Sequence, residues 1–130
     1  MRKILIVEDD PINMFLYRKM LESEGYNILM SSTGEDAIDI ARKYHPDVVL
    51  LDVFLPNRSG FDIYEDMQND ADLRDVPVVF ASASFDNDFV VERTGISREC
   101  VMRKPIIFQN LTNLMNKLTE GLTNKIVSYA

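Results

Sequence analysis

Short apolar runs alternate along the chain with segments in which apolar residues recur at intervals of three and four. The first pattern is typical of buried strands and the second of amphipathic helices. The runs predict five strands, at Lys3–Val7, Asn27–Met30, Val48–Leu51, Val76–Ala81 and Cys100–Arg103. A helix is expected after each strand, so the pattern indicates five strand–helix units in one α/β domain.

Turn and cap residues place the first two helices. Asp10 is a good N-cap, and Pro11 suits the first helical position because its missing N–H would be unpaired there anyway. Gly25 is expected to end this helix, while Ser32 opens a second one that Pro46 stops. The apolar residues that mark the first helix are Ile12, Phe15, Leu16 and Met20.

Three further helices are expected downstream, at about 59–69, at about 86–94 and over the C-terminal part of the chain. The last of them carries the strongest helical pattern, formed by Leu111, Leu114, Met115, Leu118 and Leu122. The domain is expected to span residues 1–121, and residues 122–130 to extend the last helix or to fray.

The predicted strands at Val48–Leu51 and Val76–Ala81 are apolar on both faces rather than alternating. This pattern is typical of a parallel sheet with helices on both sides, a doubly wound arrangement. In such open sheets, ligands bind beyond the carboxyl ends of the strands, where the strand order reverses. Function is therefore expected among the residues that follow the strands.

Composition limits the class of protein. With 130 residues, 46% of them hydrophobic and 27% charged, the chain suits one globular domain without a membrane span or a signal peptide. The single cysteine, Cys100, rules out an internal disulfide and favours the cytoplasm. A net charge of −7, with basic residues only in scattered pairs, argues against direct binding of nucleic acid.

Polar residues follow four of the predicted strands, and they should meet at one edge of the sheet. They are Glu8, Asp9, Asp52, Ser82 and Lys104. Crowded, buried carboxylates are costly unless a cation compensates their charge. Oxygen ligands without His or Cys favour Mg²⁺ or Mn²⁺ over Zn²⁺. The sequence therefore predicts a cation site, with Glu8 and Asp9 holding Mg²⁺.

The same residues suit phosphoryl transfer. A carboxylate can act as a covalent nucleophile, and an ammonium can neutralise phosphoryl oxygens. We therefore expect Asp52 to accept a phosphoryl group. Lys104 and Ser82 are expected to contact the phosphoryl oxygens, the hydroxyl doing so without adding charge.

In these motifs the chain resembles the receiver domains of two-component response regulators, in particular single-domain, chemotaxis-regulator-like members. The matching segments are Ile4–Pro11, Pro46–Asp52, Leu55–Gly60, the strand end at Ser82-Ala83, and Lys104-Pro105. The resemblance implies a flavodoxin-like five-stranded sheet with strand order 2-1-3-4-5. It also implies that the backbone carbonyl of Phe54 completes the Mg²⁺ shell and that the peptide bond before Pro105 is cis.

The resemblance further implies a phosphorelay or switch in two-component signal transduction, rather than a turnover enzyme. The phosphoryl donor would be a sensor histidine kinase or a histidine phosphotransfer protein. Since 130 residues leave little room for an effector domain, output is expected through protein contact at the face from helix 4 to helix 5. Receivers usually carry Tyr or Phe where this chain has Val101, so the usual aromatic switch is not expected in that form.

Three other functions are alternatives to a phosphorylated receiver, and the sequence argues against two of them. Val101 suggests a receiver-like module that is never phosphorylated. A phosphatase of the haloacid-dehalogenase type also uses a strand-end aspartate, but it has Asp-x-Asp, whereas Asp52 is followed by Val53 and Phe54. A nucleotide-binding module needs a glycine-rich loop after the first strand, where the acidic segment Glu8–Asp10 would repel phosphate.

Overall fold

The computed structural model describes residues 2–83 and 87–128, with only the backbone described for 121–128. The strands are β1 (Lys3–Val7), β2 (Asn27–Ser31), β3 (Val48–Asp52), β4 (Val78–Ser82) and β5 (Val101–Arg103). The α-helices are α1 (Pro11–Glu22), α2 (Ala37–Tyr44), α3 (Gly60–Gln68), α4 (Asn87–Thr94) and α5 (Phe108–Ser128). A 3₁₀ turn, η1 (Arg98–Cys100), leads into β5.

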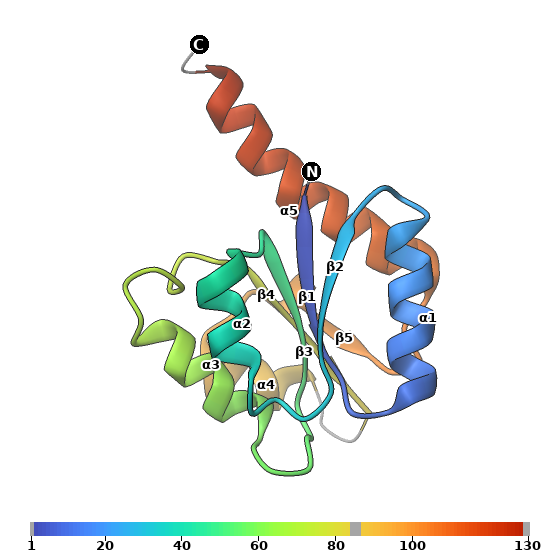
Figure 1. Ribbon diagram of the computed structural model, residues 1–130, viewed down its shortest axis with the longest axis vertical. Helices are drawn as coiled ribbons and strands as arrows, with labels where there is room; N and C mark the ends of the chain where they lie inside the picture. Colours follow the sequence, from blue (N-terminus) through green and yellow to red (C-terminus); the bar gives the residue numbers. More distant parts are fainter. Residues whose placement is uncertain (1, 84–86, 129–130) are drawn as a thin grey trace.

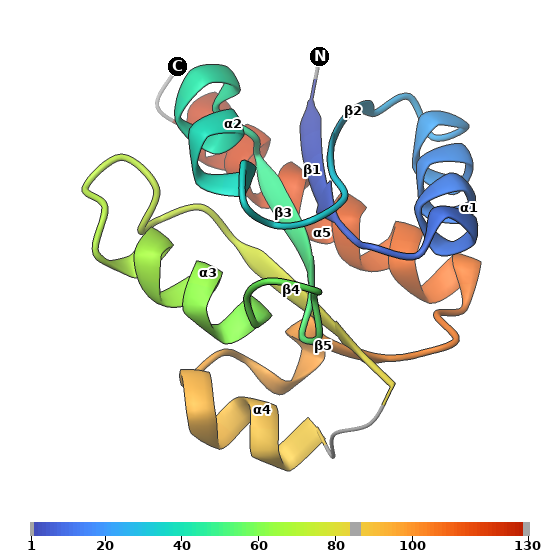
Figure 2. The ribbon, with the colours of Figure 1, turned by 60° about the horizontal axis from the view of Figure 1, so that its bottom comes forward.

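The strands form one parallel five-stranded sheet with the order β2-β1-β3-β4-β5. Helices α1 and α5 cover one face of this sheet, and α2, α3 and α4 cover the other (Figures 1 and 2). This confirms the doubly wound α/β class and the strand order expected from the sequence. The order reverses between β1 and β3, where ligands bind in folds of this type.

The apolar core lies in two layers, one on each face of the sheet. All residues of β3 are buried, and their side chains alternate between the layers. Val49 and Leu51 pack with α2, α3 and α4, while Val48 and Leu50 pack with α1 and α5. The central strand that carries Asp52 is therefore held from both sides.

The start of α2 differs from the prediction. The helix begins at Ala37 rather than at Ser32. Gly34 adopts a φ of +82°, which few other residues tolerate, and its N–H donates to Ser31 Oγ at 3.2 Å. The Ser31 hydroxyl in turn donates to the Asp36 carboxylate. These local bonds make the preceding segment a turn that packs against the sheet edge instead of a helical turn.

Two strand starts also differ from the prediction. β4 begins at Val78, not at Val76, because Pro77 has no N–H and contributes only its carbonyl to the neighbouring strand. β5 begins one residue after Cys100, which ends the 3₁₀ turn. The predicted fourth helix began at Asp86, which lies outside the described residues, as do positions 129–130 of the C-terminal segment 122–130.

Helix α1 presents to solvent three of the four apolar residues from which it was predicted, while the fourth, Met20, is partly buried against the core. Ile12, Phe15 and Leu16 are 70%, 51% and 43% exposed, whereas Tyr17 and Leu21 are buried against the sheet. The helix is thus apolar on two faces, and the sequence pattern does not distinguish which one faces the core. An apolar surface remains next to the carboxyl end of β1.

Helix α5 continues to Ser128 and extends past the edge of the sheet at which the N-terminus lies (Figure 1). The proposed domain boundary at residue 121 stays a prediction. Among the described residues, no helix combines the length and the apolar character that crossing a membrane requires.

Replacing Leu50 with alanine should destabilise the fold strongly, because its side chain is 1% exposed in the central strand. Removing it leaves a cavity that neighbours fill only in part, which costs about 2–5 kcal/mol of unfolding free energy in urea titrations. The control is Leu16→Ala on exposed α1, which should cost less than about 1 kcal/mol. Equal urea midpoints for the two variants would contradict the assigned core.

Candidate functional site

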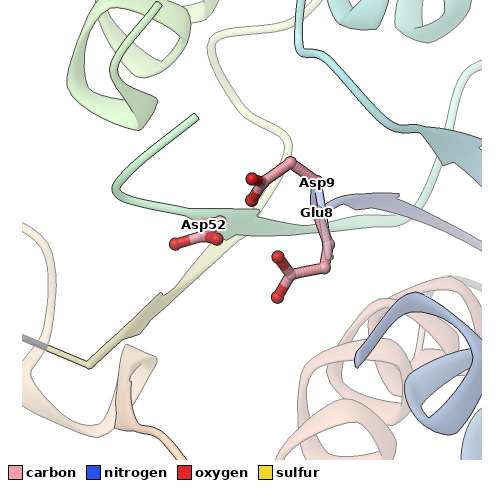
Figure 3. Close-up of side chains that lie close together, drawn as sticks. All are labelled: Glu8, Asp9 and Asp52. Atoms are coloured by element: carbon pink, nitrogen blue, oxygen red, sulfur yellow. The ribbon is translucent and has the colours of Figure 1, made fainter. Parts of the chain in front are cut away.

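Three carboxylates meet beyond the carboxyl ends of β1 and β3. Glu8 and Asp9 follow β1 directly, and Asp52 is the last residue of β3. The two strands are paired, with Val7 opposite Leu51, so their ends deliver these side chains to the same place. One oxygen from each carboxylate lies within 4.8 Å of the others, and Figure 3 shows the side chains converging. The structure thus brings these predicted residues together.

Lys104, which directly follows β5, joins the cluster across the sheet. Its Nζ donates to Glu8 Oε1 at 2.8 Å and to Asp52 Oδ2 at 2.9 Å. The side chains of Glu8, Asp52 and Lys104 are 2%, 7% and 15% exposed, so both ion pairs are largely shielded from water. The peptide bond between Lys104 and Pro105 is cis, as the resemblance implied. One ammonium therefore serves two buried carboxylates.

Burial and charge act against each other in this cluster. Burial raises the pKa of Glu8, Lys104 opposes that shift, and the nearby Asp52 adds to it. Burial works against the charge of Lys104, but its hydrogen bonds to Glu8 and Asp52 outweigh that effect and raise the pKa of the ammonium. Lys104 accordingly remains a cation throughout the physiological pH range.

Tyr17 is a neighbour of the cluster that the sequence did not single out. It is 4% exposed and belongs to the core layer under α1 and α5, which also contains Ala81, the neighbour of Ser82 in the chain. Burial raises its pKa to about 12, and the charges of Lys104 and Glu8 also act on it. Sequence reasoning missed it because the apolar residues Ile12, Phe15 and Leu16 marked a different face of this helix.

Ser82 and Phe54 occupy different environments at the same edge. Ser82, the last residue of β4, is fully buried, and its carbonyl accepts the Lys104 N–H at 2.9 Å. Phe54 has a half-exposed side chain, and its N–H donates to Asp52 Oδ1 at 3.2 Å. The phosphoryl and metal roles expected of these two residues stay predictions.

Asp10 caps α1, as the sequence indicated. Its side chain accepts the Ile12 N–H at 2.9 Å, while its own N–H donates to Glu8 Oε2 at 3.2 Å. The start of the helix thereby fixes the Glu8 carboxylate. The carboxylate of Asp9, between them, is exposed.

The backbone beside Asp52 depends on Gly60. The chain turns after β3, and the Gly60 N–H donates to the Val53 carbonyl at 2.7 Å. A Cβ at position 60 would lie 2.2 Å from the Asp52 carbonyl oxygen, too close for any side chain. Ser59 then caps α3 by accepting the Asp62 N–H at 3.2 Å. Only glycine allows α3 to begin this close to Asp52.

The donor set fits a hard divalent cation. Three carboxylates offer oxygens within a few ångströms, and neither His nor Cys is among them. Such ligands suit Mg²⁺ better than Zn²⁺. Glu8, Asp9 and Asp52 are the residues that could hold it.

A shallow hollow of about 410 Å³ adjoins the carboxylates on the side of α1 and β2. Glu8 and Asp9 line it together with apolar side chains, among them Phe15 and Met30, which is 46% exposed. The edge of the acidic site is therefore apolar on this side.

Val101 is 5% exposed and packs in the core layer of α3 and α4. Its carbonyl accepts a hydrogen bond of 3.4 Å from Asn87 Nδ2 at the start of α4. The position for which the resemblance implied an aromatic residue thus belongs here to the apolar core between β5 and α4.

Comparisons with known proteins agree with this geometry. The pattern that defines the response regulator receiver domain matches residues 4–116. The polar-differentiation response regulator DivK of Brucella ovis is 38% identical over 82 residues, which cover 63% of this chain and 67% of the relative.

Solved structures show the same fold. The signal receiver domain of a DNA-binding response regulator (merR) from Colwellia psychrerythraea superposes with a TM-score of 0.83 at 25% identity, covering 92% of this chain and 99% of that one. The chemotaxis protein CheY4 of Vibrio cholerae gives a TM-score of 0.81 at 20% identity, over 91% and 98% of the two chains.

Gly60→Ala should destabilise the protein by about 1–3 kcal/mol and shift the NMR resonance of the Phe54 amide, because the new methyl group displaces the backbone of Asp52. Gly95→Ala is the control. Gly95 has a positive φ of +73°, where alanine strains the backbone, but an added Cβ there meets nothing within 4 Å, so the Phe54 resonance should not move. An unchanged Phe54 resonance in Gly60→Ala would show that the close contact does not shape the site.

Proposed function

The chain belongs to the response regulator receiver domain family, and from this premise we propose that Asp52 accepts a phosphoryl group from a phosphohistidine donor with the help of Mg²⁺. The phosphorylated domain then switches or relays a signal through protein contact. The observation that carries the proposal is the buried Asp52 carboxylate, which shares one site with two further carboxylates and the Lys104 ammonium.

In this scheme an oxygen of Asp52 attacks the phosphorus atom of the donor. An O–P bond forms as the P–N bond to the imidazole breaks, and the electron pair of that bond stays on the imidazole nitrogen. The Phe54 N–H and the Lys104 Nζ fix the two carboxylate oxygens before the reaction. Asp52 is thereby oriented on a rigid strand rather than on a loop.

Phosphoryl transfer also requires positive charge near the phosphoryl oxygens. Glu8, Asp9, Asp52 and the Phe54 carbonyl are proposed to hold Mg²⁺, and the bound ion offsets the charge of the phosphoryl oxygens. Lys104, which contacts Asp52, would supply a second positive charge, and the buried Ser82 hydroxyl would supply a hydrogen bond. The domain promotes its own phosphorylation in this way without acting as a turnover enzyme.

Lys104 also belongs to the surface that we propose for contact with a downstream protein. This residue also lines a hollow of about 380 Å³ over β5 and the start of α5, together with Val101, Met102 and Ile106. Phosphorylation adds about two negative charges next to Lys104, which changes the forces on the end of β5. The face from α4 to α5 is therefore the proposed output surface for a downstream protein.

Incubation with acetyl phosphate and Mg²⁺ should add one phosphoryl group to the protein, and borohydride trapping should place it on the Asp52 peptide. Asp52→Asn removes the nucleophilic oxygen but keeps the shape, so mass spectrometry should detect at least about tenfold less product. Equal labelling of Asp52→Asn would exclude Asp52 as the acceptor. A lack of labelling in the parent protein would instead favour the receiver-like module that is never phosphorylated.

The apolar face of α1 is the proposed docking surface for the donor. Ile12, Phe15 and Leu16 lie just beyond the acidic segment, and the β5–α5 connection with the 64% exposed Ile107 passes beside α1 (Figures 1 and 2). A donor histidine must reach bonding distance of Asp52, so the donor protein has to cover this border of the site. Exposed apolar side chains there suit a protein contact.

Phe15→Glu should slow phosphoryl transfer from a phosphorylated histidine phosphotransfer protein by about tenfold or more, because it places a charge in the apolar contact. The rate with acetyl phosphate should stay the same, since a small donor needs no docking surface. Tyr44→Glu, at an exposed position on α2, is the matched control and should leave both rates unchanged. Equal slowing with both donors would mean that Phe15 acts on the site itself and not on docking.

A further inference from the structure

The segment between β3 and α3 connects Asp52 to the first turn of α3. The Phe54 N–H donates to Asp52 Oδ1 at 3.2 Å, and Phe54 forms an antiparallel bridge with Ser59. The Gly60 N–H donates to the Val53 carbonyl at 2.7 Å. These contacts hold the two ends of the segment together, so a shift at the Asp52 carboxylate moves the start of α3 with it.

Phe61, the next residue of α3, places its ring between the sheet and α4. The centroid of this ring lies 5.7 Å from that of Phe80 on β4 and 6.1 Å from that of Phe89 on α4, both in tilted arrangements. The Arg93 guanidinium, also on α4, lies over the Phe61 ring at 5.3 Å from the centroid. Such ring–ring and cation–ring contacts depend on orientation. The two helices lie side by side (Figure 2), so a displacement of Phe61 acts directly on α4.

The start of α4 is held weakly. Asn87 Nδ2 donates to the Val101 carbonyl at 3.4 Å, which is long for a hydrogen bond. Among the described residues, Asn87 Oδ1 is the buried side-chain atom that lacks a hydrogen-bond partner. A buried acceptor without a donor is unfavourable, so little is lost when this end of the helix moves. The helix that Phe61 contacts can therefore respond to a small displacement.

We propose that Phe61 transmits the phosphorylation of Asp52 to α4. The phosphoryl group changes the charge and the space around Asp52 Oδ1, to which the Phe54 N–H donates, and the β3–α3 segment shifts as a result. The Phe61 ring then displaces Phe89 and the start of α4, which changes the surface that this helix exposes. The inference rests on the proposed function in one respect, that Asp52 becomes phosphorylated. It gives Phe61 a coupling role for which Val101 has no ring.

Amide NMR spectra of the full chain, recorded before and after treatment with acetyl phosphate and Mg²⁺, test the coupling. The amides of Val91 and Glu92 in α4 should shift on phosphorylation of the parent protein. In Phe61→Leu this shift should fall by at least about twofold, because leucine lacks the ring that contacts Phe89. The extent of phosphorylation should stay the same, which separates coupling from damage to the site.

Tyr64→Leu is the matched control on the same helix. The Tyr64 ring also contacts Phe80, at 5.6 Å between centroids, but the described ring contact with Phe89 belongs to Phe61. This variant should therefore keep the full shift of the α4 amides. An equal loss in Tyr64→Leu, or a full shift in Phe61→Leu, would overturn the proposal.

Phe89→Leu covers the case in which Phe61→Leu fails to fold, because Phe89 is 46% exposed. It should reduce the α4 shift as Phe61→Leu does, and the double variant should lose no more than either single variant, since both remove the same contact. An undiminished shift in Phe89→Leu would refute the coupling. A parent protein that is not phosphorylated on Asp52 would instead refute the proposed function, and this inference with it.

Discussion

Mutual repulsion among buried carboxylates is the constraint on which the rest of the site depends. The parallel register of β1 and β3 places Glu8, Asp9 and Asp52 at one sheet edge, and backbone hydrogen bonds fix the strands there. Such a cluster is unfavourable unless positive charge lies within it, because little water reaches Glu8 and Asp52. Lys104 meets this need within the chain. The same demand for positive charge makes the site suited to a metal ion and to a phosphoryl transition state.

The helices around this edge hold the site residues in place on one side and leave the site accessible on the other. Gly60 lets α3 begin against the backbone of Asp52, and Asp10 fixes Glu8 while it caps α1. The outer face of α1 stays apolar and open to solvent. Rigidity on the inner side and access on the outer side are both needed, since a buried nucleophile must still meet its phosphoryl donor.

The sequence predicted the sheet and the acidic edge because both follow from local patterns. A fully apolar run such as Val48–Leu51 indicates a doubly covered strand, and parallel strands end at one edge, so Asp52 and Glu8 had to be close. The start of α2 failed because it depends on the φ of Gly34 and on hydrogen bonds of Ser31. Neither is visible as a hydrophobic period.

For the same reason, the hydrophobic pattern did not predict which residues a given side chain contacts in the folded protein. The apolar stripe correctly predicts the helix α1, but the exposure of Ile12, Phe15 and Leu16 depends on which face of the helix meets the sheet. The buried residues Tyr17 and Leu21 lie on that face. The double contact of Lys104 could not be read from its place after β5 either, because it depends on the length of Glu8 and on its reach across two strands.

The sheet also has a gradient of mechanical restraint, which follows from its strand lengths and order. β3 is enclosed between two neighbours and two helical layers, whereas β5 has three residues and pairs with β4 alone among the described strands. Backbone amides should therefore exchange with solvent slowly near the nucleophile and faster toward β5. A change at Asp52 on the firmly held β3 should therefore move the backbone most at β5, which has fewer neighbours. β5 is the strand at which the domain can change shape most easily.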